Sequence, residues 1–309
     1  MMNNLQMIET LSSDNLLSLD EILLWALELF ENKRPNKLDL SDFKKPLIAG
    51  SGNAIVTAKI IFSWIDALFC DETNFEQYLN RNIDWLIILS ASWEKHATIF
   101  AKKALEKWIK TKLLTCNYNS SAGKIVWIEN TIVTEKNREP YTYNTSTYMW
   151  WIFAYTWEDP SIIKKFIQEE IDPIINKINF SKYNWYLLVT PNIFAGVNQL
   201  FNVKFIELFG RRIARDVFSY EHLKHAITVV PYEKELAISF WEWNFQYFWD
   251  TINIPLPKSC KLWWIMAIWY YVIWKIQNSY PQYFKENIWK YIEEINKTDF
   301  GKGLSVIVE

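Results

Sequence analysis

Two short loops in the first third of the chain carry residues suited to binding a phosphate group. The first is Gly50-Ser51-Gly52-Asn53, where glycine lets the backbone turn sharply and approach a ligand closely. The second is Ser90-Ala91-Ser92, whose two hydroxyls come directly before a predicted helix. Hydroxyls and the free N–H groups of a helix N-terminus bind a phosphate monoester without a metal ion. A structural turn would also explain the first loop alone, and the second loop favours binding.

A buried strand is predicted before each of these loops. Strands are predicted at 46–49, 85–89, 111–115 and 130–134, and the apolar run at 86–89 is typical of a strand buried on both faces. Helical patterns follow at 54–68, 94–107, 144–156 and 160–178. Strand, loop and helix in this order indicate a parallel sheet with helices on both faces. Such sheets bind ligands at the carboxyl ends of their strands, where both loops lie.

The same order of elements begins again in the second half of the chain. Strands are predicted at 185–189, 213–217, 226–230 and 236–239, and helices at 197–208, 262–277 and 281–294. An amphipathic helix is predicted at 15–33, before the first strand. We therefore expect an α/β protein of two three-layer αβα units with parallel, doubly wound sheets, plus N- and C-terminal helices. The expected ranges are 1–40 for an N-terminal helical segment, 41–180 for the first domain and 181–309 for the second.

Composition limits the classes of function. The formal net charge of −2 gives no nucleic-acid footprint, and three histidines leave little material for a metal site. Three scattered cysteines and the lack of a signal-peptide pattern favour the cytoplasm. The apolar run at 262–276 is too short to span a membrane and contains Lys275, so a buried helix is expected there. We expect no metal, no cofactor, no nucleic acid and no membrane as partners.

The balance of tryptophan and glycine is unusual. The chain has 18 tryptophans and 7 glycines, whereas glycine usage of about 7% would give roughly 22. The sum of the two counts, 25, restores ordinary glycine usage. Our hypothesis is that most of these tryptophans are glycines in the organism, from UGA codons that its ribosomes read as glycine. An aromatic-rich natural protein is the alternative.

Several tryptophans stand where a backbone commonly needs glycine. Trp108 and Trp157 come at predicted helix ends, the usual place for a glycine cap. Trp241 and Trp243 flank Glu242 in a predicted loop after the strand at 236–239, whereas Trp85 lies in a strand and suits a genuine tryptophan. The predicted helix at 262–277 becomes a small-residue helix if positions 263, 264, 269 and 274 are glycine.

Trp93 matters most, because it lies between the serine loop and the next helix. An indole would fill the space that a phosphate needs there, and glycine would leave it open. With glycine at 93, Ser90-Ala91-Ser92 and Glu94 resemble the SxSG loop of the SIS (sugar isomerase) family, whose domains bind phosphosugars. Where that family has threonine two positions after its glycine, this chain has Lys95, which could neutralise a phosphate.

Further segments carry the same resemblance. Residues 50–54 resemble the family's first loop, and 113–120, with Thr115, resemble its segment after the third strand. Glu139 and 145–148 resemble its Glu…Ser-Thr stretch, although Glu139 could instead orient the start of a helix. The resemblance covers about 45–170 and, more weakly, 184–290. It implies a phosphosugar site formed by Gly50, Ser51, Gly52, Asn53, Ser90, Ser92, position 93, Lys95, Thr115 and Glu139.

The second half holds the residues with implied catalytic roles. Residues 204–207 resemble the family's KxxE helix, which makes Glu207 the catalytic base. Residues 221–226 resemble its ELKHG segment, which makes His225 the group that opens the sugar ring, with His222 as the alternative. Histidine can donate or accept a proton near neutral pH, and a carboxylate can move a proton between carbons. Glu207 could equally be a solvated helix residue and His225 a structural histidine.

Two tandem units of this kind resemble bifunctional phosphoglucose/phosphomannose isomerases and the isomerase part of glucosamine-6-phosphate synthase. The resemblance implies interconversion of glucose or mannose 6-phosphate with fructose 6-phosphate, without a cofactor. It also implies a homodimer, because members of the family often complete the site across two subunits. The alternative is a non-catalytic phosphosugar-binding module that senses metabolite levels. The cluster of Arg211, Arg212 and Arg215 could bind a ligand phosphate or pair with surface acids.

Overall fold

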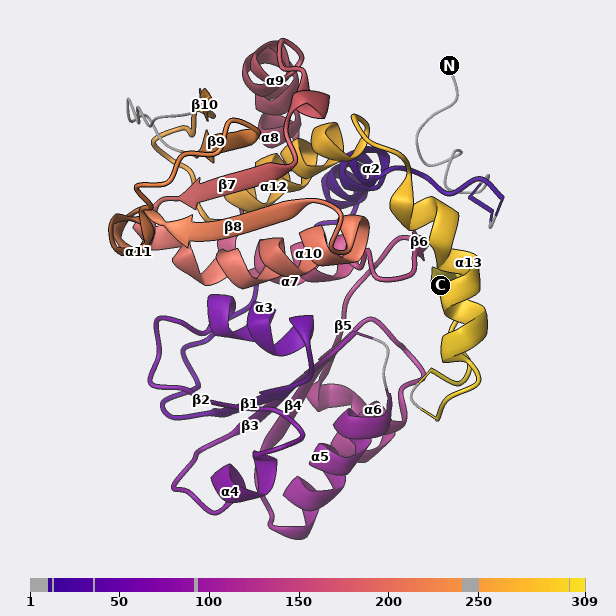
Figure 1. The fold of residues 1–309 in the computed structure, drawn as a ribbon. Helices are drawn as coiled ribbons and strands as arrows, with labels where there is room; N and C mark the ends of the chain where they lie inside the picture. The colour runs from indigo at the N-terminus through magenta and orange to yellow at the C-terminus, as the bar shows by residue number, and fades with distance from the viewer. Residues whose placement is uncertain are drawn as a thin grey trace. The chain divides into compact units, whose positions relative to one another are not determined.

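The computed structural model describes residues 11–12, 14–35, 37–91, 94–240, 250–299 and 301–308 (Figure 1). The chain forms two compact units, each built around its own parallel sheet. We call Arg34–Lys136 with Ser146–Trp157 the first-sheet unit. We call Met1–Lys33 with Asn137–Thr145 and Glu158–Glu309 the second-sheet unit. Four residues singled out from the sequence lie outside the described residues: Ser92, Trp93, Trp241 and Trp243.

The first-sheet unit contains a five-stranded parallel sheet in the order β2-β1-β3-β4-β5. Its strands are β1 (Leu47–Gly50), β2 (Leu68–Cys70), β3 (Leu86–Ser90), β4 (Thr111–Thr115) and β5 (Thr131–Val133). Four of them match predicted strands. The exception is β2, because the helix predicted over 54–68 ends early, as α3 (Asn53–Ile61), and the chain then enters the sheet.

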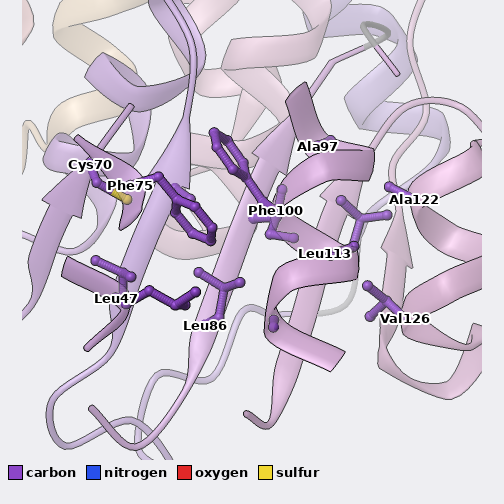
Figure 2. Packing of buried hydrophobic residues seen from close by; sticks show 14 residues of the cluster. Leu47, Cys70, Phe75, Leu86, Ala97, Phe100, Leu113, Ala122 and Val126 are labelled. Atoms are coloured by element: carbon purple, nitrogen blue, oxygen red, sulfur yellow. The ribbon is translucent and has the colours of Figure 1, made fainter. Parts of the chain in front are cut away.

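Both faces of this sheet are buried. On one face, Leu47, Leu86 and Leu113 pack with Phe75 and Phe100, whose rings lie 4.4 Å apart (Figure 2). The helices supplying this layer are α4 (Phe75–Leu79), α5 (Glu94–Glu106) and α6 (Ser121–Val126). The alternate strand residues Ile48, Ile87 and Leu89 are also buried, and α3 packs against β1 and β3. The same unit contains most of α7 (Thr145–Thr156).

The second-sheet unit contains a four-stranded parallel sheet in the order β10-β9-β7-β8. Its strands are β7 (Trp185–Thr190), β8 (Ala214–Ser219), β9 (Glu235–Ser239) and β10 (Asp250–Asn253). The strand predicted at 226–230 is wrong. That stretch follows α11 (Tyr220–Ala226), and its apolar residues Ile227, Val229 and Val230 are exposed. The fourth position is filled by β10, which pairs with β9.

This unit also contains α12 (Leu262–Gln277), which is buried along most of its length, and further helices. They are α2 (Leu19–Asn32), α8 (Pro160–Phe166), a π-helical segment (Ile167–Ile171), α9 (Asp172–Ile175), α10 (Asn198–Phe209) and α13 (Tyr283–Ile295), with 3-10 turns at Phe180–Lys182 and Asn192–Val197. The first-sheet unit has a further 3-10 turn at Ile128–Asn130. A two-stranded antiparallel ladder joins β6 (Glu139–Pro140) to β11 (Ile307–Val308). Within the described residues, no helix combines the length and apolar character needed to cross a membrane.

These units differ from the expected ranges 1–40, 41–180 and 181–309. Helices α2 and α8 pack together, and α12 packs against both α2 and the π-helical segment. The N-terminal helix and the segment from 158 to 180 therefore group with the second sheet. The reason is that α12 is apolar on all sides and needs helices from distant parts of the chain to cover it.

Candidate functional site

The order of the first sheet places a ligand-binding crevice between β1 and β3. From β1 the chain moves outward to β2, and it then returns to the other side of β1 to form β3. Parallel sheets bind ligands at such a switch point, outside the carboxyl ends of the strands. Residues 50–53 follow β1 and residues 90–91 follow β3. The described parts of both predicted phosphate loops therefore lie at the same edge of the sheet, at its switch point.

The two glycines of the first loop meet different backbone demands. A Cβ at Gly50 would lie 3.1 Å from the carbonyl oxygen of Leu89 and 3.2 Å from the nitrogen of Ile55. Gly52 has open space around it but a φ of +54°, and it is the N-cap of α3. Glycine at 50 thus allows close packing of β1 against its neighbours, and glycine at 52 allows the left-handed turn into the helix.

The polar side chains of the loops lie partly exposed at this edge. Ser51 donates a hydrogen bond of 2.7 Å to Glu72. Ser90 is paired in register with Thr115 on β4. Thr115 is buried, and its hydroxyl accepts from the backbone N–H of Asn117 at 3.1 Å, so it shapes the loop after β4.

Asn53 begins α3 and is half-buried, with its carbonyl accepting from the hydroxyl of Thr57. Lys95 lies in the first turn of α5, but its side chain is outside the described part of the structure. Among the described residues, no cluster of three or more histidine, cysteine or acidic side chains could hold a metal ion.

Glu139 lies in the second-sheet unit and is buried. Its carboxylate accepts a hydrogen bond of 2.6 Å from the backbone N–H of Thr145, the first residue of α7. An acidic side chain at this position stabilises a helix N-terminus. The contact agrees with the alternative role of Glu139, which is to orient the start of a helix.

The ammonium group of Lys204 is buried, which the sequence did not lead us to expect. Its Nζ donates to the carbonyl oxygens of Thr142 at 2.6 Å and Tyr143 at 2.9 Å, and pairs with Glu207 at 2.7 Å. Three acceptors satisfy the three donors of a lysine. The sequence marks this pair by its i,i+3 spacing, but nothing in the pattern indicates the two carbonyl partners. Those carbonyls belong to a turn with left-handed backbone, in which φ is +71° at Thr142 and +44° at Asn144.

Glu207 and His225 lie at opposite edges of the second sheet. Helix α10 starts beyond the carboxyl end of β7 and runs back along the sheet, so Glu207, in its last turn, is near the amino ends of the strands (Figure 1). His225 lies on α11, which begins directly after the carboxyl end of β8, and its side chain is exposed. A single second-sheet unit therefore does not bring these two residues together. His222, on the same helix, packs against Phe218 with ring centroids 5.1 Å apart.

The arginine cluster makes local contacts. Arg215 donates from Nε to Asn202 at 3.0 Å, and partial burial lowers the pKa of its guanidinium group. Arg212 lies over the ring of Tyr283 at 5.1 Å. Neither contact is to an acidic side chain, so the choice between a ligand phosphate and surface acids for this cluster stays a prediction.

Three tryptophans have left-handed backbone conformations at helix ends. The φ angles are +57° at Trp108, +74° at Trp127 and +56° at Trp157. At the end of α5, the N–H of Trp108 bonds to the carbonyl of Leu105 and that of Ile109 to the carbonyl of Ala104. This pair of bonds defines a Schellman motif, whose left-handed residue is usually glycine. The helix ends predicted at Trp108 and Trp157 are therefore both present, and Trp127 is a third position of the same kind.

The tryptophans of α12 have different surroundings. The ring of Trp269 stacks on Phe201 at 4.1 Å and on Phe240 at 5.3 Å, so it packs as an ordinary core aromatic. The indole N–H groups of Trp269 and Trp274 are nevertheless buried without a hydrogen-bond partner among the described residues. Leaving such a donor unsatisfied costs about 1–3 kcal/mol.

The fold resembles those of solved enzymes that act on sugar phosphates. No family model and no curated protein matches the sequence. Glucosamine-6-phosphate deaminase from Thermotoga maritima is 14% identical with a TM-score of 0.55, over 89% of this chain and 93% of that one. Tagatose-6-phosphate ketose/aldose isomerase from Escherichia coli is 13% identical with a TM-score of 0.54, over 86% and 90%. The C-terminal domain of glucosamine-fructose-6-phosphate aminotransferase from Francisella tularensis is 12% identical with a TM-score of 0.55, over 84% and 94%. At these identities the similarity establishes a shared fold.

Proposed function

We propose that this protein is made of two SIS-type units and binds a phosphosugar at the carboxyl edge of its first sheet. The observation that carries the proposal is the position of the loops at 50–53 and 90–91 on either side of the switch point between β1 and β3. Hydroxyls from Ser51 and Ser90 and the N-termini of two helices would bind the phosphate group. The shared fold with enzymes of sugar phosphates supports the same ligand class. A cytoplasmic location is part of the proposal, and the free thiols of the three cysteines would stay reduced there.

We further propose an aldose–ketose isomerisation, of glucose or mannose 6-phosphate to fructose 6-phosphate. The ring opens when the C1 hydroxyl loses a proton and the ring oxygen gains one, and histidine suits this transfer. A carboxylate base then takes the proton from C2 while O1 gains a proton, which gives an enediol. The base returns the proton to C1 as O2 loses its own. No external oxidant is needed. The bound phosphate fixes the orientation of the sugar through contacts that are remote from the reacting carbons.

In this proposal Glu207 is the base, and His225 comes from the second subunit of a homodimer. The positions of the two residues at opposite edges of one sheet support a site shared between subunits. Mixing Glu207→Gln and His225→Ala proteins tests the sharing, because a mixed dimer has one intact site. A two-fold dimer then recovers about a quarter of the wild-type activity from two inactive variants. No recovery after subunit exchange would contradict a shared site.

The reaction itself is tested with the chain carrying glycine at 93, assayed for fructose 6-phosphate formation. The Glu207→Gln variant retains an acceptor for Lys204 but loses the base, so turnover should vanish while phosphosugar binding remains. Glu294→Gln is the matched control, because Glu294 pairs with Lys297 three residues away on the surface. Equal turnover in the wild type and Glu207→Gln would refute the role of Glu207.

A non-catalytic phosphosugar sensor is the second candidate. The contact that favours it is the ion pair between Glu207 and Lys204, since one carboxylate oxygen is already bound by the buried ammonium. A base must release that oxygen or use the other one. Saturable phosphosugar binding without turnover of either hexose phosphate, unchanged in Glu207→Gln, would favour the sensor.

We also propose that several tryptophan positions, including 93, are glycine in the organism through UGA recoding. The left-handed backbone at Trp108, Trp127 and Trp157 supports glycine at those positions. Non-glycine residues pay about 1–2 kcal/mol for this conformation. Sequencing the gene gives a direct test, and UGG codons at 93, 108, 157 and 274 would overturn the hypothesis. The stacking of Trp269 makes that position the weakest member of the set.

A further inference from the structure

The second sheet repeats the strand order of the first. Written as 8-7-9-10, it corresponds to the order 2-1-3-4, with β7 in the place of β1 and β9 in the place of β3. Its topological switch point therefore lies between β7 and β9. By the rule for open α/β sheets, a ligand crevice is expected at the carboxyl ends of these two strands.

A cavity of about 180 Å³ lies at that point. It is lined by residues that end β7 and β9, among them Thr190 and Ser239. The Ser239 side chain is buried, with 3% of its surface exposed, and it lines the cavity. Its hydroxyl can both donate and accept a hydrogen bond, so it can pair with a ligand there.

Two more polar groups lie at the same cavity with unused hydrogen-bonding capacity. Thr190 donates its hydroxyl proton to Asn198 at 2.7 Å, which leaves the oxygen able to accept a second bond. The side-chain oxygen of Asn192 accepts from the backbone N–H of Glu221 at 2.8 Å, and its NH₂ group bonds to the Glu221 carboxylate, which leaves one of its two N–H donors for a ligand. Thr190, Asn192 and Ser239 thus offer both donors and acceptors to one small molecule.

The remaining lining is apolar or aromatic and carries no full charge. Pro191, Ile193 and the ring of Tyr220 contribute to the wall. Neither a lysine or arginine nor a carboxylate is among the described residues that line it. An anion would lack a countercharge there, and Pro191 removes one backbone N–H from the start of the following helix. The cavity is also smaller than the roughly 300 Å³ at which sites for drug-sized ligands begin.

We propose that this cavity is a second binding site, for an uncharged polyhydroxylated molecule the size of one sugar ring. The hydroxyls of the ligand pair with Thr190, Asn192 and Ser239, and its C–H face packs on Tyr220 and Ile193. The site lies wholly within the second-sheet unit, and its described lining includes no tryptophan. It is therefore independent of the phosphosugar proposal for the first sheet.

The test is a titration of the full chain with fructose, glucose and glucose 6-phosphate, followed by methyl NMR. The reporter is the δ1-methyl signal of Ile193, assigned by its loss in Ile193→Val. We expect a saturable shift with a Kd of about 1 mM, typical of a small ligand with few contacts. The neutral sugars and glucose 6-phosphate should shift the signal with similar affinities, because no charged side chain is among the described residues that line the cavity.

Ser239→Ala should weaken binding about 3- to 10-fold, the loss of one hydrogen bond. Ser279→Ala is the matched control, since Ser279 makes a helix-end contact to Lys275 outside the cavity and should leave the affinity unchanged. No shift with any sugar up to about 50 mM, far above a millimolar Kd, would overturn the proposal. So would equal affinity in Ser239→Ala, or a shift with glucose 6-phosphate alone.

Discussion

Replacing Trp108 separately by glycine and by alanine isolates the backbone preference at the end of α5. Both changes remove the same indole, which is 89% exposed and contributes little packing. The difference between the two variants therefore reports the conformation of the residue itself. The matched position is Ile99, an exposed residue in the middle of the same helix.

The magnitude follows from the φ of +57° at Trp108. Alanine pays about 1–2 kcal/mol in the left-handed region, whereas glycine pays nothing. Glycine gives back about 0.4–1 kcal/mol because its unfolded chain has more freedom. Trp108→Gly should thus exceed Trp108→Ala in free energy of unfolding by about 0.5–1 kcal/mol. At Ile99 the order should reverse, with alanine ahead by about 1 kcal/mol, as in any helix interior.

The measurement is urea-induced unfolding of the four variants, monitored by circular dichroism. The double difference between the two positions should be about 1.5–2 kcal/mol, which such data resolve. If alanine is the more stable substitution at both positions, residue 108 does not occupy a left-handed conformation. The backbone conformation would then no longer be an argument for glycine at position 108 in the organism.

Three further outcomes follow from particular contacts. Gly50→Ala should lower phosphosugar affinity at least about tenfold, because its Cβ meets backbone on two sides, and calorimetric titration measures that loss. Gly52→Ala has open space for its Cβ and should cost about 1–2 kcal/mol of stability through its φ alone, which urea unfolding measures. Burial raises the pKa of Asp20 to about 6, so the folded state binds this proton more tightly than the unfolded state, and stability should fall as pH rises from about 4 to 6. Asp20→Asn should remove this pH dependence of stability and be more stable than the wild type at pH 7 by up to about 3 kcal/mol. If unfolding curves of the variant from pH 4 to 8 show the same pH dependence as the wild type, Asp20 is not its source. Lys204→Met should lower the free energy of unfolding by about 3 kcal/mol, because it leaves two carbonyl oxygens and Glu207 without their donor. A decrease below about 1 kcal/mol in urea unfolding would show that water reaches these acceptors.

The elements that sequence reasoning found are those with a strong local signal. The runs at 46–49 and 85–89 are apolar throughout and 111–115 contains Leu113 and Leu114, and strands covered on both faces suit such apolar residues. The run at 226–230 is also apolar but is not a strand, because Ala226 ends α11 and Ile227, Val229 and Val230 are exposed rather than covered by a sheet. Strand β10 was missed because Asp250–Asn253 has little apolar character.

The residues of the candidate site also differ in whether a local sequence pattern indicates them. Glycine loops and serine pairs are local patterns, so the sequence could indicate the edge at 50–53 and 90–91. The burial of Lys204 depends on carbonyls more than 60 residues earlier, at Thr142 and Tyr143, and no local pattern encodes that distance. The cavity at β7 and β9 has no glycine motif, and its lining comes together only through the strand order.

If both proposals hold, the two switch points bind different ligands with one topology. At the first, the proposed phosphate site uses the backbone N–H groups of the loop at 50–53, which suit a phosphate. At the second, the equivalent position after β7 is Pro191, which has no N–H and a fixed φ. Recognition there has to come from the side chains of Thr190, Asn192 and Ser239, which suit hydroxyl groups. Pro191→Gly should therefore raise the affinity for glucose 6-phosphate relative to glucose at this cavity. If the ratio of the two affinities in the Ile193 methyl titration is unchanged, the backbone N–H does not set this selectivity.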